Sequence, residues 1–259
     1  MTLLQGLLHL TDFGSQLLRT SVPSITAAVA IQTAFAIPSI IAQSERFYDF
    51  SGSLTFLSVT ALSLYLPALR ARYGSGVASN EPLPSLLSPF LAAGGRNGFN
   101  WRQVALSGAV AIWAMRRMLM TLPLTMGVVR LTWALWQTQV GSYLFHRILK
   151  EGKDSRFDRI RGSPSFFAVV WVAQAVWVSV SLLPVLAVNS IPTTAFAAIP
   201  TVKFTDILGF SLFVGGLLFE VVADWQKSKW LEQKKAKVHD EEFLTRGLWS
   251  RRLVFTMLL

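Results

Sequence analysis

Two carboxylates and two ammonium groups lie close together near the end of the last apolar segment of this 259-residue chain. Glu220 and Asp224 are four residues apart, so a helix places both on one face. Lys227 and Lys229 follow within about one turn, where cations interact favourably with a helix C-terminus. Carboxylates accept hydrogen bonds from hydroxyl and amino groups and lysines bind phosphates, so this set suits a nucleotide ligand. The alternative is a helix that emerges into lipid headgroups, with Asp224 paired to Lys227.

Other polar residues beside apolar sequence are weaker candidates for chemistry. Arg116 and Arg130 interrupt apolar runs, where a charge needs a partner, a ligand or room to reach the membrane surface. Tyr48 and Asp49 lie next to a long apolar run and offer a hydroxyl and an acid, but an anchoring role at the membrane interface is favoured for both. No catalytic residue is predicted from these positions.

Several classes of site are excluded by what the sequence lacks. It has no cysteine and three scattered histidines, which argues against a zinc site or any other metal site. The dinucleotide motif Gly-x-Gly-x-x-Gly, the Walker motif and the hydrolase motif Gly-x-Ser-x-Gly are also missing. The net charge of +10 comes from basic residues at the ends of apolar runs, a distribution that indicates membrane loops and not nucleic-acid binding.

The elements that must position these residues are membrane-spanning helices. The composition is 52% hydrophobic and the mean hydropathy is +0.46, which is unusual for a soluble domain. Runs without charge are long enough to cross a bilayer, and we expect an all-α polytopic transmembrane bundle of about five or six spans, preceded by an interfacial segment over residues 1–20. The apolar runs are Ser21–Ala42, Ser51–Leu69, Val104–Phe145 with interruptions, Pro164–Val202 with a second short or re-entrant piece, and Phe204–Val222.

The basic loops predict which side of the membrane they face. His146–Arg161 holds six Lys or Arg against three acids, and Lys227–Arg252 holds eight against four. Both are expected in the cytoplasm, with Asn189–Val202 on the other side, because basic loops are retained there. The chain is thus expected to be an integral membrane protein whose basic C-terminal segment is cytoplasmic.

Four sequence blocks are informative when they are taken together. They are RFYDFSGSLTFLS (46–58), GSYLFHRILKEGKDSRFD (141–158), FEVVADWQKSKW (219–230) and RGLWS (246–250). In this order and spacing they resemble the steroid 5-alpha-reductase-like membrane proteins, in particular a branch described as a domain of unknown function. The resemblance runs over roughly residues 20 to 252, so we expect one reductase-like transmembrane domain over 21–252.

The resemblance implies an NADPH-dependent reductase of carbon–carbon double bonds, in the endoplasmic reticulum or another internal membrane, with a hydrophobic lipid-like substrate. In steroid reductases the helix matching 219–230 carries a polar residue and an aspartate, four apart, that contact the cofactor. Glu220 and Asp224 occupy those positions here. Their expected companions in cofactor binding are Gln226, Lys227, Lys229, Lys153, Asp154, Arg156 and Arg116.

The chain departs from the family in two places. After Gly-Leu-Trp-Ser the family continues with a pattern like Arg-x-Arg-His-Pro-Asn-Tyr-x-Gly-Glu, whereas residues 253–259 read as an aberrant tail, so the chain is expected to be truncated and inactive. Joining the block around Arg116 to Gly141 restores the family pattern, so residues 117–139 are interpreted as an insert translated from a retained intron. With the insert as a span of its own, the loop after Arg70 faces the cytoplasm; without it, that loop faces the other side.

Two other functions fit a helical membrane bundle of this kind. Membrane methyltransferases that use S-adenosylmethionine have a similar compact arrangement with a cytoplasmic cofactor pocket. A non-catalytic protein that binds lipid or a protein partner is the third possibility, and the missing C-terminal pattern favours it.

Overall fold

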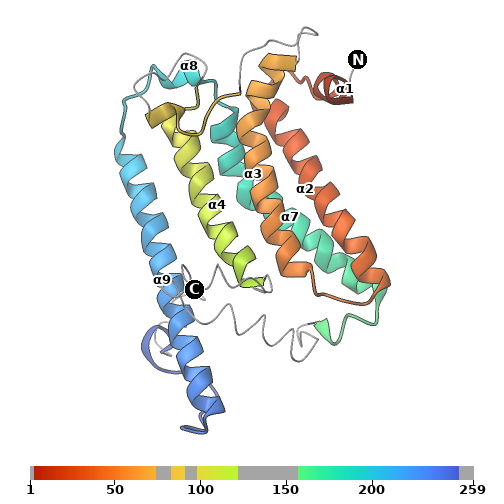
Figure 1. Ribbon diagram of the computed structural model, residues 1–259, viewed down its shortest axis with the longest axis vertical. Helices are drawn as coiled ribbons and strands as arrows, with labels where there is room; N and C mark the ends of the chain where they lie inside the picture. The colour runs from red at the N-terminus through yellow and green to blue at the C-terminus, as the bar shows by residue number, and fades with distance from the viewer. Residues whose placement is uncertain (1–2, 74–82, 91–97, 122–156, 251–259) are drawn as a thin grey trace, which may run out of the picture. The chain divides into compact units, whose positions relative to one another are not determined.

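The structure is a computed structural model that describes residues 3–73, 83–90, 98–121 and 157–250, and in these ranges its regular elements are helices (Figure 1). This confirms the predicted all-helical fold class. In chain order the elements are α1 (Leu3–Leu10), α2 (Gln16–Ile41), α3 (Tyr48–Tyr73), η1 (Ser88–Phe90), α4 (Trp101–Thr121), α7 (Pro164–Ser190), α8 (Thr193–Phe196), α9 (Phe204–Lys235) and η3 (Gly247–Trp249).

Among the described residues, four helices are long and apolar enough to cross a membrane, namely α2, α3, α7 and α9. By length and composition the chain is therefore an integral membrane protein. The predicted count of five or six spans is too high for this part of the chain. The run from Pro164 to Val202 forms one long helix and the short α8, with Pro192 between them, so the second piece is the short one of the two predicted alternatives. Residues 122–145, which entered the predicted count, lie outside the described residues.

Contacts between residues divide the chain into two compact units. The first comprises residues 1–118 and 154–201 and holds α1, α2, α3, α7, α8 and most of α4; we call it the bundle. The second comprises residues 119–153 and 202–259 and holds α9 and η3; we call it the C-terminal unit. Of the interpreted insert, 117–121 belong to the helix α4, and 122–139 lie outside the described residues, as does the tail 253–259.

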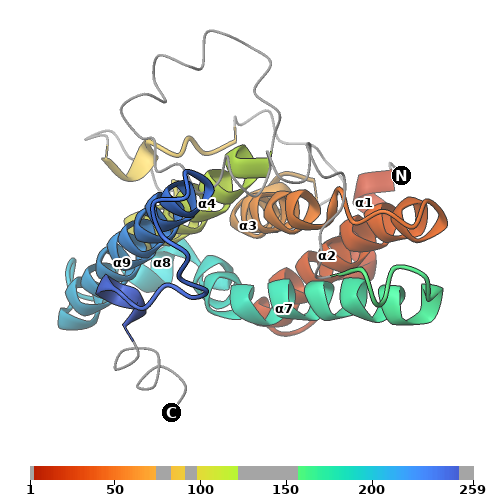
Figure 2. The same cartoon turned by 90° about the horizontal axis from the view of Figure 1, so that it is seen from below.

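Within the bundle, α2 lies beside both α3 and α7 (Figure 2). Small side chains make this close approach possible, because membrane helices associate through backbone proximity and tight packing. Every three or four residues along α2 a small or slender side chain is buried. The buried members on α2 are Ser21, Ser24, Ala28, Gln32, Ala36 and Ser39, and on α3 the small ones include Ser51, Gly52, Thr55 and Ser63.

Buried hydrogen bonds connect the helices of the bundle. Gln32 donates from Nε2 to Thr55 Oγ1 at 2.7 Å, which joins α2 to α3. Asn189 on α7 is fully buried and donates from Nδ2 to Ser63 Oγ on α3 at 2.9 Å and to Ser107 Oγ on α4 at 3.1 Å. Hydrogen bonds of this kind join helices where the surrounding lipid offers no alternative partner.

The helix α1 is held against the end of α3 by Arg70. Its guanidinium donates to the carbonyl oxygens of Leu8 at 2.7 Å, Thr11 at 3.0 Å and Arg19 at 3.1 Å. The carbonyls of Leu8 and Thr11 belong to the last turn of α1 and to the residue after it. At a helix C-terminus such carbonyls receive no hydrogen bond from a later turn of the same helix. Arg70 therefore fixes the interfacial helix that the sequence predicts at the N-terminus.

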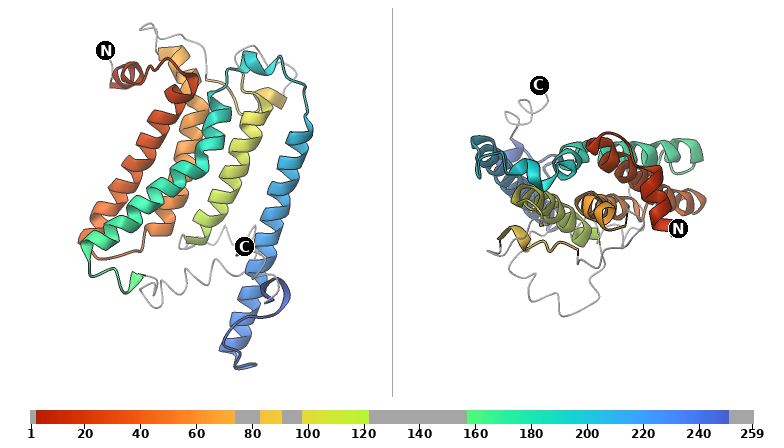
Figure 3. Two further views of the ribbon diagram at one scale, coloured as in Figure 1. Left: turned by 180° about the vertical axis from the view of Figure 1, so that it is seen from behind. Right: turned by 90° about the horizontal axis from the view of Figure 1, so that it is seen from above.

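The last turn of α3 and the first turn of α7 lie at opposite ends of the bundle (Figure 3). Arg161 pairs with Glu45, just before α3, whereas Arg70 lies in the last turn of this 26-residue helix, which is roughly 39 Å long at 1.5 Å per residue. The first residues of α7 therefore lie at the other end of the bundle from Arg70. The side of the membrane that each loop faces stays a prediction.

Candidate functional site

The residues predicted to bind a cofactor gather on the last part of α9. This helix continues without a break from Phe204 to Lys235, because its polar half is rich in good helix formers such as Ala, Gln, Lys, Leu and Glu. Glu220 and Asp224 are both half-buried and lie one turn apart on the same face, as predicted. Lys227 and Lys229 are exposed, so their ammonium groups can meet a charged ligand.

Residues 236–250 turn back along α9, and we call them the return segment. The turn begins at Lys237, whose φ of 56° lies in the left-handed region, and a second such residue is Gly247 with φ of 62°. Backbone N–H of Leu248 donates to Gln226 Oε1 at 2.8 Å, and Trp249 Nε1 donates to the carbonyl of Ala223 at 3.0 Å. A Cβ at position 247 would overlap the Gln226 carboxamide, so glycine is required there by both backbone and space.

Aromatic rings position the lysines of this surface. The Lys227 ammonium lies 5.5 Å from the centre of the Trp249 ring, and the Lys229 ammonium lies 5.3 Å from that of Trp225. Such contacts stabilise a cation by roughly 0.5–1 kcal/mol at exposed sites. They hold the side chains in place, and an ammonium group with three hydrogens can meet a phosphate oxygen while one side of it faces a ring.

The outer part of the return segment is held by ring stacking and by charge. The rings of Trp230 and His239 stack with centroids 5.3 Å apart. Arg246 forms an ion pair with Glu241, and the hydrogen bond from Arg246 lowers the pKa of the Glu241 carboxyl below its ordinary value. The return segment is therefore fastened at its far end as well as at Leu248.

The predicted cofactor residues are divided between the two units and the part of the chain that is not described. Glu220, Asp224, Gln226, Lys227 and Lys229 share the C-terminal unit, but the carboxamide oxygen of Gln226 is used to hold the return segment. Arg116 is half-buried on α4 in the bundle. The loop residues lie outside the described residues; they are Lys153, Asp154 and Arg156.

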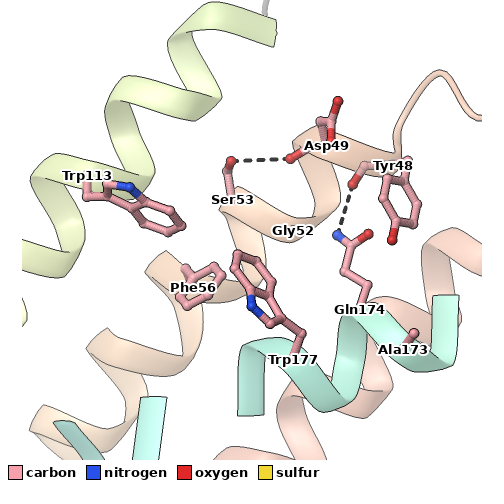
Figure 4. A pocket seen from close by; sticks show the side chains of 9 residues that line it. All are labelled: Tyr48, Asp49, Gly52, Ser53, Phe56, Trp113, Ala173, Gln174 and Trp177. Atoms are coloured by element: carbon pink, nitrogen blue, oxygen red, sulfur yellow. Dashed lines mark hydrogen bonds between the residues drawn. The ribbon is translucent and has the colours of Figure 1, made fainter. Parts of the chain in front are cut away.

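The bundle contains a cavity of about 260 Å³ between α3, α4 and α7 (Figure 4). Polar groups from the first turns of α3 and from α7 line one end of it, and three aromatic rings line the other. The ring of Phe56 meets those of Trp113 and Trp177 edge to face, with centroids 5.1 and 5.3 Å apart. The lining residues are Tyr48, Asp49, Gly52, Ser53, Phe56, Trp113, Ala173, Gln174 and Trp177.

Sequence reasoning missed most of this cavity. Tyr48 and Asp49 were noticed, but as interfacial anchors, and Gln174 lies inside an apolar run in which it attracted no attention. A signal was present in the spacing, because Gln174 and Trp177 are three apart and therefore share one face of α7. What the sequence does not give is the partner helix that this face meets.

Comparison with models of protein families matched one family, described as "Protein of unknown function (DUF1295)", over residues 85–252. The match covers 168 of the 259 residues, from η1 through η3, and so includes α4, α7 and α9. Comparison with curated proteins and with solved structures found no match. The resemblance inferred from residue 20 onward is thus supported from residue 85.

Proposed function

The chain belongs to the DUF1295 family, a membrane family that is steroid 5-alpha-reductase-like, and from this premise we propose that it binds NADPH at the end of α9 and is a reductase of carbon–carbon double bonds in a lipid-like molecule. The proposal joins two features. One is a charged surface in the C-terminal unit, and the other is a set of membrane-spanning helices with an internal cavity.

The observation that carries the proposal is the arrangement of charges on α9. Glu220 and Asp224 share one half-buried face, where carboxylates accept hydrogen bonds from ribose hydroxyls or a nicotinamide amide. Lys227 and Lys229 follow them, exposed and held over indole rings, where they suit the phosphate groups of a dinucleotide. In chemical type this set fits NADPH.

The return segment supports this assignment. Trp249 bonds Ala223, which lies between the two acids in sequence, and Leu248 bonds Gln226, which lies between Asp224 and Lys227. The segment therefore fixes the part of α9 that carries all four charged groups, and a binding surface that is ordered before the ligand arrives loses less entropy on binding. Gln226 acts through the return segment and is a positioning residue in this proposal.

A bound NADPH would supply the hydride that adds to one carbon of the double bond, while a proton adds to the other and NADP⁺ is left. The residues of α9 bind and orient; none of the described groups is assigned as the proton donor. We further propose that the protein resides in the endoplasmic reticulum or another internal membrane, with the basic segment Lys227–Arg252 in the cytoplasm, because it holds eight Lys or Arg against four acids.

The test is equilibrium binding of NADPH and of S-adenosylmethionine to the purified full chain in lipid nanodiscs. Saturable binding of NADPH, with no binding of S-adenosylmethionine, is the expected result. Binding of S-adenosylmethionine alone would make the protein a methyltransferase candidate. Binding of neither would favour a non-catalytic membrane protein and reject the proposal.

A further inference from the structure

The carboxamide of Gln174 presents an unused acceptor in the wall of the bundle cavity. Its side chain lines the cavity, is 6% exposed, and donates from Nε2 to the carbonyl oxygen of Tyr48 at 3.0 Å (Figure 4). Because a carbonyl can only accept, this bond fixes which end of the amide is nitrogen. The oxygen Oε1 then has no hydrogen-bond partner among the described residues. A buried acceptor without a partner costs free energy, which a ligand with a donor would restore.

The other polar hydrogens at this end of the cavity are already used. The Ser53 hydroxyl donates to the carbonyl of Asp49 at 3.2 Å, and the Tyr48 hydroxyl donates to the carbonyl of Val170 at 3.3 Å. What these side chains offer a ligand is therefore acceptors, namely Gln174 Oε1 and the lone pairs of Ser53. The indole N–H groups of Trp113 and Trp177 belong to the aromatic end.

The backbone of α3 keeps Gln174 in this place. Gly52 lies against the Gln174 side chain, and a Cβ at position 52 would overlap Nε2. Glycine thus allows the amide to reach the Tyr48 carbonyl across the α3–α7 contact. The acceptor is part of a fitted arrangement of two helices and not of a mobile surface side chain.

From this donor and acceptor count we infer that the cavity binds the hydroxyl end of a lipid alcohol, with Gln174 as the residue that selects hydroxyl over ketone. An alcohol donates its hydroxyl hydrogen to Gln174 Oε1. A ketone has no such hydrogen, and its oxygen would face the acceptor atoms at this end of the cavity. The apolar part next to the hydroxyl lies against Phe56, Trp113 and Trp177. A volume of about 260 Å³ is less than a whole drug-sized ligand usually fills, so the cavity holds one end of the lipid.

This inference deepens the proposed function, since it rests on that function in treating the lipid as substrate. Binding of the lipid needs no nucleotide, however, and can be measured without one. Failure of NADPH to bind would reject the cofactor proposal and leave the cavity untouched. Failure of the lipid test would reject the cavity inference and leave the α9 surface untouched.

The experiment measures binding of matched tritiated lipids to the full chain in nanodiscs, without nucleotide. One pair is 5α-cholestanol and 5α-cholestanone, and the other is 2-hexadecanol and 2-hexadecanone, so that a fused-ring lipid is distinguished from a straight chain. In at least one pair the alcohol is expected to bind about tenfold more tightly than its ketone. Equal binding, tighter ketone binding or no binding in both pairs would overturn the inference.

Two leucine variants separate recognition from stability. Gln174→Leu is expected to bring the alcohol-to-ketone ratio close to one. Gln32→Leu removes another buried amide of the bundle, whose Nε2 bonds Thr55 and which does not line the cavity, and it should keep the wild-type ratio. If Gln174→Leu does not fold, Gly52→Ala displaces the amide from α3 and should lower the ratio in the same way. A ratio unchanged in a folded Gln174→Leu or Gly52→Ala variant contradicts the role of Gln174.

Discussion

Arg161 donates two hydrogen bonds to the carboxylate of Glu45, at 2.6 Å to Oε1 and 2.9 Å to Oε2, and so joins the residues before α3 to those before α7. The Glu45 side chain is buried with 6% exposure, and that of Arg161 is largely covered with 13% exposure. The hydrogen bond to Glu45 raises the pKa of Arg161, which keeps the guanidinium charged. The Tyr48 ring lies beside this connection and packs against Phe157 and Trp171, so the pair closes one end of the bundle next to the cavity.

Breaking this pair should destabilise the bundle strongly. Arg161→Met leaves the Glu45 carboxylate buried without its partner, and we expect a loss of roughly 3 kcal/mol in the free energy of unfolding. The measurement is thermal unfolding of the full chain in a mild detergent. Asp158→Asn is the matched control, because Asp158 pairs with Arg161 from an exposed position and should shift the transition only slightly.

Substituting Gly247 should detach the return segment from α9. Gly247→Ala adds a Cβ in a left-handed backbone and against the Gln226 carboxamide, so the hydrogen bond between Leu248 and Gln226 should break. We expect faster amide exchange over residues 236–250 and unchanged exchange in the bundle. Gly216→Ala is the control, since a Cβ there meets nothing within 4 Å and alanine favours a helix. Equal exchange in both variants would contradict the role given to Gly247.

Lowering the pH should weaken the attachment of the return segment, residues 236–250. The pKa of Glu241 is lowered by Arg246 in the folded chain, so the ion pair stabilises the fold above the ordinary glutamate pKa of about 4.3 and this contribution is lost as pH falls through the lower, folded value. Amide exchange over residues 236–250, corrected for its intrinsic pH dependence, should stay constant from about pH 7 to 5 and rise below about pH 4. Arg246→Gln removes the cause and should remove this rise.

Removing Arg70 should release α1. Arg70→Met removes the guanidinium donors to the carbonyl oxygens of Leu8, Thr11 and Arg19. These oxygens receive no hydrogen bond from within a helix. Protease cleavage within residues 3–12 is expected to become much faster than in the wild-type chain. Arg72→Met serves as control, because Arg72 lies over the Tyr73 ring and should leave α1 in place.

The membrane-spanning helices could be predicted from the sequence, because long runs of residues without charge seldom form other structures. Ser21–Ala42 and Ser51–Leu69 correspond to α2 and α3; α2 begins before the first run and ends at Ile41, and α3 extends past both ends of the second run. The polar half of α9 was not expected to continue as a helix to Lys235. Hydropathy shows only where the apolar residues of a span end, whereas residues that favour a helix can continue beyond the membrane surface. The shared face of Glu220 and Asp224 followed directly from their spacing.

Long-range partners could not be predicted in the same way. Nothing near Gln174 in sequence indicates that the carbonyl of Tyr48, 126 residues away, fixes its amide. Gln226 was predicted to bind the cofactor, whereas its carboxamide oxygen bonds Leu248 in the return segment. Periodicity identifies which face of a helix is shared, but the helix or loop that meets this face depends on packing of the whole unit.

The most direct test of the account is the affinity of NADPH for the full chain in nanodiscs, measured for the wild type and for a Glu220→Gln, Asp224→Asn double variant. The account predicts saturable binding that weakens by about a hundredfold or more, since two charged acceptors are neutralised and each contributes roughly 1.5–3 kcal/mol. Glu232→Gln, further along α9, should leave the affinity unchanged. Wild-type affinity in the double variant, or no NADPH binding by the wild type, would contradict the assignment of this surface.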